Sequence, residues 1–117
     1  MTKLKPAKLS PRMENGTLCW YEGDTFKLLL DLDLTDQDGA AITLEPEDQL
    51  TLRFWDRDGC QVRELTYTGG DVTENRISIE MDETLTAAFP RGKYWLDVQV
   101  LRENKTTVVK GSPVKVE

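Results

Sequence analysis

The sequence predicts a single all-β domain built as a sandwich of two sheets, and three observations lead to this fold class. Apolar and polar residues alternate over several short segments, turn-forming residues separate those segments, and only one stretch follows a helical pattern. The 117 residues are enough for one hydrophobic core. A hydrophobic content of 38% beside 31% charged residues suits strands with one packed and one solvated face.

Alternation with a period of two is clearest in four parts of the chain. Their apolar positions are Phe26, Leu28, Leu30, Leu32 and Leu34; Leu50, Leu52 and Phe54; Ile77, Ile79 and Met81; and Tyr94, Leu96, Val98 and Val100. Successive side chains of a strand point to opposite faces, so each of these segments would bury one face. We expect strands near residues 17–22, 25–34, 40–44, 50–56, 60–68, 75–81, 92–102 and 106–116.

Two turns repeat the pattern Asp-x-Asp-Gly, at residues 36–39 and 56–59. Glycine supplies the positive φ that a tight hairpin needs, and an Asp side chain accepts hydrogen bonds from nearby backbone amides. Gly39 and Gly59 are therefore expected to be structural residues of hairpin turns.

Residues 82–89 depart from the strand pattern. Asp82 is a good helix cap, Leu85 and Phe89 are four residues apart, and a proline follows at position 90. The pattern predicts a short helix that crosses from one sheet to the other, with Gly92 opening the next strand. Seven or eight short strands with one crossover helix indicate an immunoglobulin-like Greek-key sandwich over residues 17–117.

The first 16 residues are expected to form a basic, flexible arm outside this domain. Lys3, Lys5, Lys8 and Arg12 give the first 13 residues a charge of +4, which leaves −10 on residues 14–117 for a whole-chain charge of −6. Such an acidic domain is a poor match for phosphates, so we do not expect a nucleic-acid partner.

We expect neither a membrane-spanning helix nor an export signal in this chain. No apolar run approaches the length of a membrane helix, and the first residues lack the apolar stretch of a secretory signal. Without export, Cys19 and Cys60 are expected to be reduced thiols, with a disulfide between them as the alternative.

The residues needed for common catalytic sites are missing. The chain has no histidine, which removes the commonest general base and the commonest metal ligand. Gly69-Gly70 stands without the lysine and helix of a phosphate-binding loop. We therefore expect no enzymatic activity and no cofactor.

The first Asp-rich turn is the closest approach to a metal site. Asp36, Asp38 and Glu45 match three positions of a calcium-binding loop, but Leu34 occupies its first position and cannot bind a cation. A hairpin turn explains the same residues, so we expect no metal there.

The exposed aromatic residues indicate a contact surface. If the alternating leucines face the core, Trp55 and Trp95 point outward and lie close together, because the third and sixth strands of such a sandwich are antiparallel neighbours. Arg53 and Leu101 would share this face. Exposed tryptophans beside an arginine are typical of protein interfaces and of sugar-stacking platforms. The alternative is that one tryptophan is covered by the helix or by the N-terminal arm, with Trp20 as part of the same cover.

Tyr94 follows Gly92 at the start of the strand that comes after the crossover. This position matches the tyrosine corner of immunoglobulin-like sandwiches, where the hydroxyl bonds to upstream backbone. Leu96 stands where antibody domains have a cysteine, so aliphatic packing would replace that disulfide.

Several phrases of the sequence together resemble a known family over residues 20–116. They are Asp24-Thr25-Phe26 before alternating leucines, the Asp38-Gly39 turn, the run from Gly92 to Val100, and the return strand around Val108-Val109-Lys110-Gly111. The chain resembles the small immunoglobulin-like domains of phage and prophage tails, especially the N-terminal domain of baseplate upper proteins. The resemblance implies a structural protein that forms homo-oligomers, contacts other tail proteins and resides in the virion or the bacterial cytoplasm.

Three functional hypotheses follow. The first is a non-enzymatic assembly module of a phage tail that acts through protein–protein contacts. The second is a carbohydrate-binding module that uses the exposed tryptophans. The third is a calcium-stabilised adhesin-type domain.

Overall fold

The computed structural model describes residues 9–32, 38–41, 43–73 and 76–117, with the backbone alone at 107–110. Within these residues the chain forms eight strands, a 3-10 turn (η1, Gly69–Asp71) and one short α-helix (α1, Glu83–Thr86). The strands are β1 (Arg12–Glu14), β2 (Thr17–Trp20), β3 (Phe26–Asp31), β4 (Gln49–Asp56), β5 (Gln61–Thr68), β6 (Arg76–Met81), β7 (Gly92–Arg102) and β8 (Lys105–Val116). The all-β prediction is confirmed.

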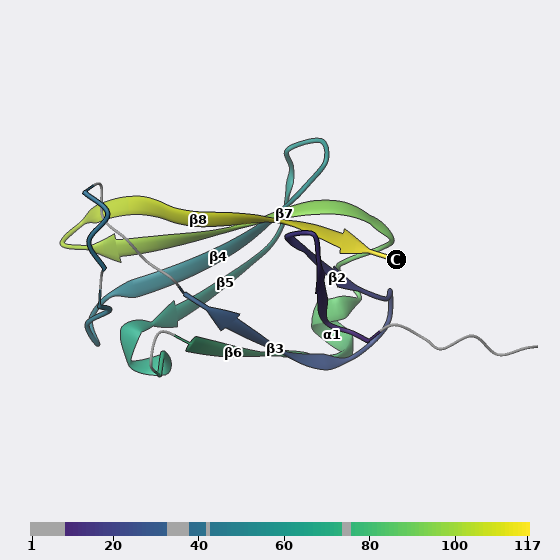
Figure 1. Ribbon diagram of the computed structural model, residues 1–117, viewed down its shortest axis with the longest axis horizontal. Coiled ribbons are helices and arrows are strands. Elements are labelled where there is room, and N and C mark those ends of the chain that lie inside the picture. The colour runs from purple at the N-terminus through teal and green to yellow at the C-terminus, as the bar shows by residue number, and fades with distance from the viewer. Residues whose placement is uncertain (1–8, 33–37, 42, 74–75) are drawn as a thin grey trace, which may run out of the picture.

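The strands form two sheets that lie as two layers (Figure 1). The larger sheet has the order β1-β2-β8-β7-β4-β5, and the smaller one consists of β3 and β6. Neighbouring strands are antiparallel except for β2 and β8, which pair in parallel. β4 and β7 are antiparallel neighbours, the pairing expected for the third and sixth strands of an immunoglobulin-like sandwich.

The core lies between the two sheets and is made by the alternating positions that the sequence predicts. Leu50, Leu52 and Phe54 of β4 are fully buried, whereas the residues between them are only partly buried. Trp20, Phe54 and Phe89 form a group of rings with centroids 4.8 to 6.5 Å apart and edge-to-face angles. Such pairs add about 0.5–1.5 kcal/mol each beyond their buried area. Trp20 thus belongs to the core.

The crossover helix is shorter than the sequence predicts but has the expected role. Asp82 caps α1 by accepting a hydrogen bond from the backbone N–H of Leu85 at 2.9 Å. Leu85 and Phe89 are both buried, and α1 connects β6 of the small sheet to β7 of the large sheet.

The second Asp-x-Asp-Gly turn joins β4 to β5 as predicted. Asp56 Oδ1 accepts from the amides of Asp58 and Cys60, both at 2.9 Å, and Gly59 has a φ of 81°. Gly39 in the first copy has a φ of 82°, while Asp36 and Gln37 lie outside the described residues.

Two predictions about strand positions are corrected. The strand expected at 40–44 is absent from the described residues of that segment, where Ala41 makes only an isolated bridge. Its backbone instead bonds to a side chain, because Arg102 Nη2 donates to the Thr43 carbonyl at 3.0 Å. Conversely, β1 lies within the stretch assigned to the basic arm.

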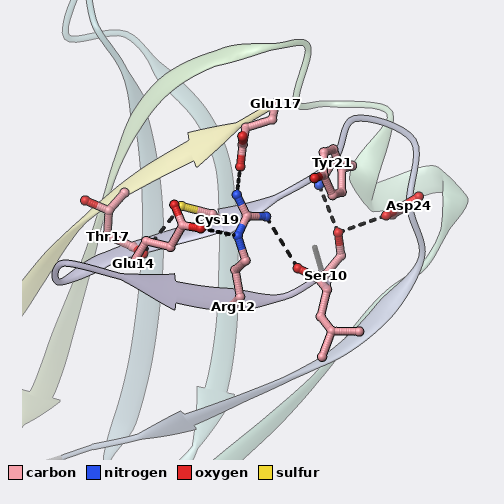
Figure 2. Close-up of polar contacts among 9 residues, drawn as sticks. Ser10, Arg12, Glu14, Thr17, Cys19, Tyr21, Asp24 and Glu117 are labelled. Atoms are coloured by element: carbon pink, nitrogen blue, oxygen red, sulfur yellow. Dashed lines mark hydrogen bonds and ion pairs between the residues drawn. The ribbon is translucent and has the colours of Figure 1, made fainter. Parts of the chain in front are cut away.

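The β1–β2 hairpin is held to the end of the sandwich by a polar cluster around Arg12 (Figure 2). Arg12 Nε donates to Glu14 Oε1 at 2.9 Å, and its Nη2 forms an ion pair with Glu117 at the end of β8. Ser10 Oγ donates to Asp24 Oδ2 at 2.8 Å and accepts from the Tyr21 amide. These contacts fix residues 10–14 beside the start of β3.

Candidate functional site

Trp55 and Trp95 are direct partners in the ladder between β4 and β7. Both alternate with buried residues, so they lie on the outer face of the large sheet, away from the small sheet. The predicted proximity of the two tryptophans is therefore present. We call the surface formed by Arg53, Trp55, Trp95 and Asp97 the tryptophan face.

Trp55 is held in place by a hydrogen bond. Its Nε1 donates to Oδ2 of Asp97 at 2.9 Å, and the side chain is partly buried. Asp97 lies diagonally across from Trp55 in the ladder, two residues beyond Trp95. A bonded and half-covered indole has few conformations left to lose when a partner binds.

Trp95 is the most exposed of the three tryptophans, with 46% of its surface accessible. Its ring lies against the backbone of Gly111 on β8, because a Cβ built at Gly111 would be 2.3 Å from Trp95 Cζ2 and 2.8 Å from Nε1. Gly111 therefore provides a flat support for the ring, since any larger side chain would occupy the same space. The remaining surface of Trp95 is accessible.

Arg53 lies nearer to the two tryptophans than Leu101 does. Arg53 pairs with Asp97 in the ladder, donates from Nη1 to Gln99 Oε1 at 2.7 Å and lies 3.8 Å from Glu64. Leu101 is on the same face, but it lies six residues beyond Trp95, about 20 Å along the strand. The structure therefore leaves Leu101 outside the tryptophan face.

Two buried polar atoms of the tryptophan face have no hydrogen-bond partner among the described residues. They are Nε of Arg53 and Oδ1 of Asp97. Buried polar atoms are nearly always bonded, so these two atoms are exceptions inside the tryptophan face.

Tyr94 makes the contact expected of a tyrosine corner. Its hydroxyl donates to the carbonyl of Pro90 at 2.5 Å, and its ring packs edge-on against Phe89 with centroids 5.4 Å apart. Burial, followed by the nearby carboxylates of Asp56 and Glu22, raises the pKa of the phenol. Gly92 begins β7 two residues earlier.

The described residues contain no group of three or more acidic or cysteine side chains that could hold a metal ion. Of the weak calcium candidates, Asp38 and Glu45 lie in this described part, and Asp36 lies outside it. Cys19 is buried and Cys60 is exposed, and the two thiols are free.

Sequence reasoning missed a buried ion pair at the far end of β4 and β7. Asp48 is 3% exposed and accepts from Arg102 Nε at 2.8 Å, from Arg102 Nη2 at 2.5 Å and from the Glu45 amide at 2.8 Å. The hydrogen bonds from Arg102 are the main reason that the pKa of Asp48 is lowered. No local pattern indicates this pair, because its members are 54 residues apart.

Sequence reasoning also missed an apolar groove of about 380 Å³ beside β3. Leucines of β3, with Leu18, Leu96 and Val98, form its floor, and residues 11–13 and 111–112 complete its walls. The alternation of leucines in β3 predicts a buried face but does not indicate that one edge of that face stays open.

No protein-family model matches the chain, and no curated protein matches it. None of the described helices is long and apolar enough to cross a membrane. Function must therefore be argued from the surfaces of the molecule.

Proposed function

We propose that this chain is a non-enzymatic structural module of a phage or prophage tail that assembles through protein–protein contacts. The tryptophan face is its contact surface, and a second copy of the chain and other tail proteins are its partners. The assignment to a tail rests on the sequence resemblance alone, whereas the contact mode rests on the geometry of the tryptophan face.

The paired tryptophans are the observation that supports this mode best. Tryptophan and arginine are the residues most enriched at the energetic centres of protein interfaces. Here Trp95 rests on Gly111 and Trp55 is bonded to Asp97, so both rings are already ordered. Preordered aromatic rings bind a partner at a smaller entropic cost than mobile ones.

The polar side chains beside the rings favour a protein partner. Arg53 is partly exposed and lies 3.8 Å from Glu64, so both charges border the aromatic patch. A polar border around an apolar centre is the usual anatomy of a protein interface.

The mass of the chain in solution as a function of concentration tests the proposal. We expect the mass to rise with concentration, and we expect Trp95→Ala to weaken this association at least tenfold while the chain stays folded. Leu9→Ala is the control, because it removes a 78% exposed apolar side chain that belongs neither to the tryptophan face nor to the groove. A mass that stays at one chain, or equal association of both variants, would overturn the proposal.

A carbohydrate partner is the second candidate, and the exposed indole of Trp95 favours it. A flat, accessible indole can stack on a sugar ring. Saturable quenching of tryptophan emission by oligosaccharides, lost in Trp95→Ala, would support this function. Absence of any response across a panel of oligosaccharides would remove it.

A further inference from the structure

Strand β3 has one edge that no described residue pairs with, and we call this its free edge. It pairs with β6 along its whole length, from Phe26 opposite Met81 to Asp31 opposite Arg76, and no other described residue pairs with it. The two strands form the lower layer in Figure 1. An unpaired edge presents backbone N–H and C=O groups that can accept another strand.

In the described part of the chain, the facing sheet is also incompletely paired on this side. β2 pairs with β8 only from Val114 to Val116, so the earlier part of β8 has no described neighbour on that side. The apolar groove lies in this gap, between Leu28 and Leu30 of β3, with Leu32 just after the strand, and Leu96 and Val98 of β7. A strand added to β3 would direct every second side chain into the groove.

The groove has a fixed wall at the start of β3. Residues 11–13 line it, and Arg12 is held there by Glu14 and Glu117 while Ser10 is bonded to Asp24 (Figure 2). Met13 and Leu29 border the groove and are 62% and 63% exposed. This side of the molecule therefore combines the free edge of β3, the apolar groove and exposed apolar side chains at the border of the groove.

The outward residues of β3 carry a charge pattern. Lys27, Leu29 and Asp31 are exposed, and the two charged residues flank the leucine at alternate positions. Their present partners on β6 are Glu80 at 4.0 Å and Arg76 at 2.6 Å, and all four side chains are at least 60% exposed. Each charge can therefore face a second opposite charge from the free side.

We propose that the free edge of β3 is a strand-addition site for an extended segment of a partner protein. The segment runs antiparallel to β3, places apolar side chains in the groove at alternate positions, and carries a basic residue opposite Asp31 and an acidic residue opposite Lys27. Main-chain hydrogen bonds supply affinity and the alternate side chains supply specificity. The inference deepens the proposed function, on which it rests, by giving the assembly module a second contact surface.

The charge pattern allows a test with two peptides of identical composition. The matched peptide contains Lys-Val-Thr-Val-Glu, which places Lys opposite Asp31 and Glu opposite Lys27 in the antiparallel register, with both valines inward. The swapped peptide contains Glu-Val-Thr-Val-Lys and places like charges together. Backbone amide signals of the intact ¹⁵N-labelled chain report binding.

We expect saturable shifts of the amides of residues 26–31 and of Leu18, Leu96 and Val98 with the matched peptide. The swapped peptide should bind roughly tenfold more weakly, because two favourable cross-strand pairs become unfavourable. In the double variant Lys27→Glu/Asp31→Lys the preference should reverse. Since Lys27 and Asp31 are exposed, the double variant should keep its fold, which its unchanged spectrum outside β3 and β6 would show.

Three results would overturn the inference: no saturable binding of either peptide, equal binding of both, or an unchanged preference in the double variant. Slow hydrogen exchange, without peptide, of the β3 amides that do not bond to β6 would also overturn it. A second copy or another part of the chain would then cover the free edge. The tryptophan face is tested separately. Failure of Trp95→Ala to affect association would refute that face and leave the peptide result unaffected.

Discussion

The tryptophan face and the open side beside β3 both expose large apolar side chains, but they hold them differently. On the tryptophan face, Trp55 is bonded to Asp97 and Trp95 rests on the backbone of Gly111. On the open side, Leu29 and Met13 border a groove beside β3, and among the described residues β3 has no strand partner on that side. The two surfaces therefore do not differ in exposure but in how their side chains are held. The tryptophan face is preordered by contacts within the chain, whereas the side beside β3 has a strand edge that no described residue pairs with.

The largest expected effect on stability comes from the buried ion pair between Asp48 and Arg102. Asp48 directly precedes β4 and Arg102 ends β7, and these two strands carry the tryptophan face outside and part of the groove inside. Asp48→Asn should lower the free energy of unfolding by about 2–3 kcal/mol, because it leaves a partly buried guanidinium without its counterion. Denaturant unfolding measures this, and Asp31→Asn, in an exposed ion pair, should change it by less than about 0.5 kcal/mol. Equal effects of the two substitutions would refute the assigned role of the buried pair.

The same pair gives an acid dependence with a definite sign. The pKa of Asp48 is lowered from its ordinary value of 3.8, so the ionised carboxylate stabilises the fold above that value. This contribution should be lost as the pH falls through the lowered pKa, and the wild type and Asp48→Asn should converge in stability there. A difference that stays constant down to the acid transition would contradict the assignment.

The next effect concerns Gly111, which contacts Trp95 and also lines the groove. Gly111→Ala should displace the Trp95 ring and cost about 1–2 kcal/mol of stability, since the new methyl group overlaps the indole. Association through the tryptophan face should fall with it. Gly70→Ala is the matched control, because its methyl group would lie 3.6 Å from Thr68 Oγ1, an ordinary contact. Unchanged Trp95 emission in Gly111→Ala would show that the ring does not rest on this glycine.

A smaller effect concerns the bond that orders Trp55. Asp97→Ala removes the acceptor of the Trp55 Nε1 hydrogen bond and should cost about 1 kcal/mol, the net value of a typical bond. Its melting temperature and the emission of Trp55 provide the measurement. A variant with unchanged stability and unchanged emission would show that the bond does not order the ring.

The smallest effect is expected at the open side. Leu29→Thr should alter stability by less than about 0.5 kcal/mol, because the side chain is mostly solvated and threonine suits a strand. Thermal unfolding checks this. A loss above about 1 kcal/mol would show that Leu29 is part of the core and that the open side is closed.

Local patterns in the sequence were sufficient for the strands and turns that depend on local chemistry. Alternation located β4, β6 and β7, and Asp82 with Leu85 located the crossover helix. β1 was missed although Asn15-Gly16 is a strong hairpin signal, with φ values of 51° and 81° at the two residues. The lysines upstream favour a flexible arm, and this signal was given more weight than the Asn-Gly turn. The sequence therefore contained the information needed to predict β1.

Features that depend on contacts between distant residues were out of reach of local patterns. The pairing of Trp55 with Trp95 followed from the expected neighbours of a sandwich, but the support from Gly111 depends on the register of β7 against β8. The burial of Trp20 and the absence of a strand at 40–44 also depend on tertiary contacts. The open edge of β3 arises because the small sheet has only two strands among the described residues.

The most direct test of the central claim asks whether association covers the tryptophan face. Acrylamide quenching of tryptophan emission can be measured in dilute and concentrated samples of the intact chain, with Trp95 as the most accessible indole and Trp20 fully buried. Quenching should fall as concentration rises, in parallel with the increase in mass. Quenching that stays constant across the concentration range, whether or not the mass rises, would contradict the tryptophan face as the surface of assembly.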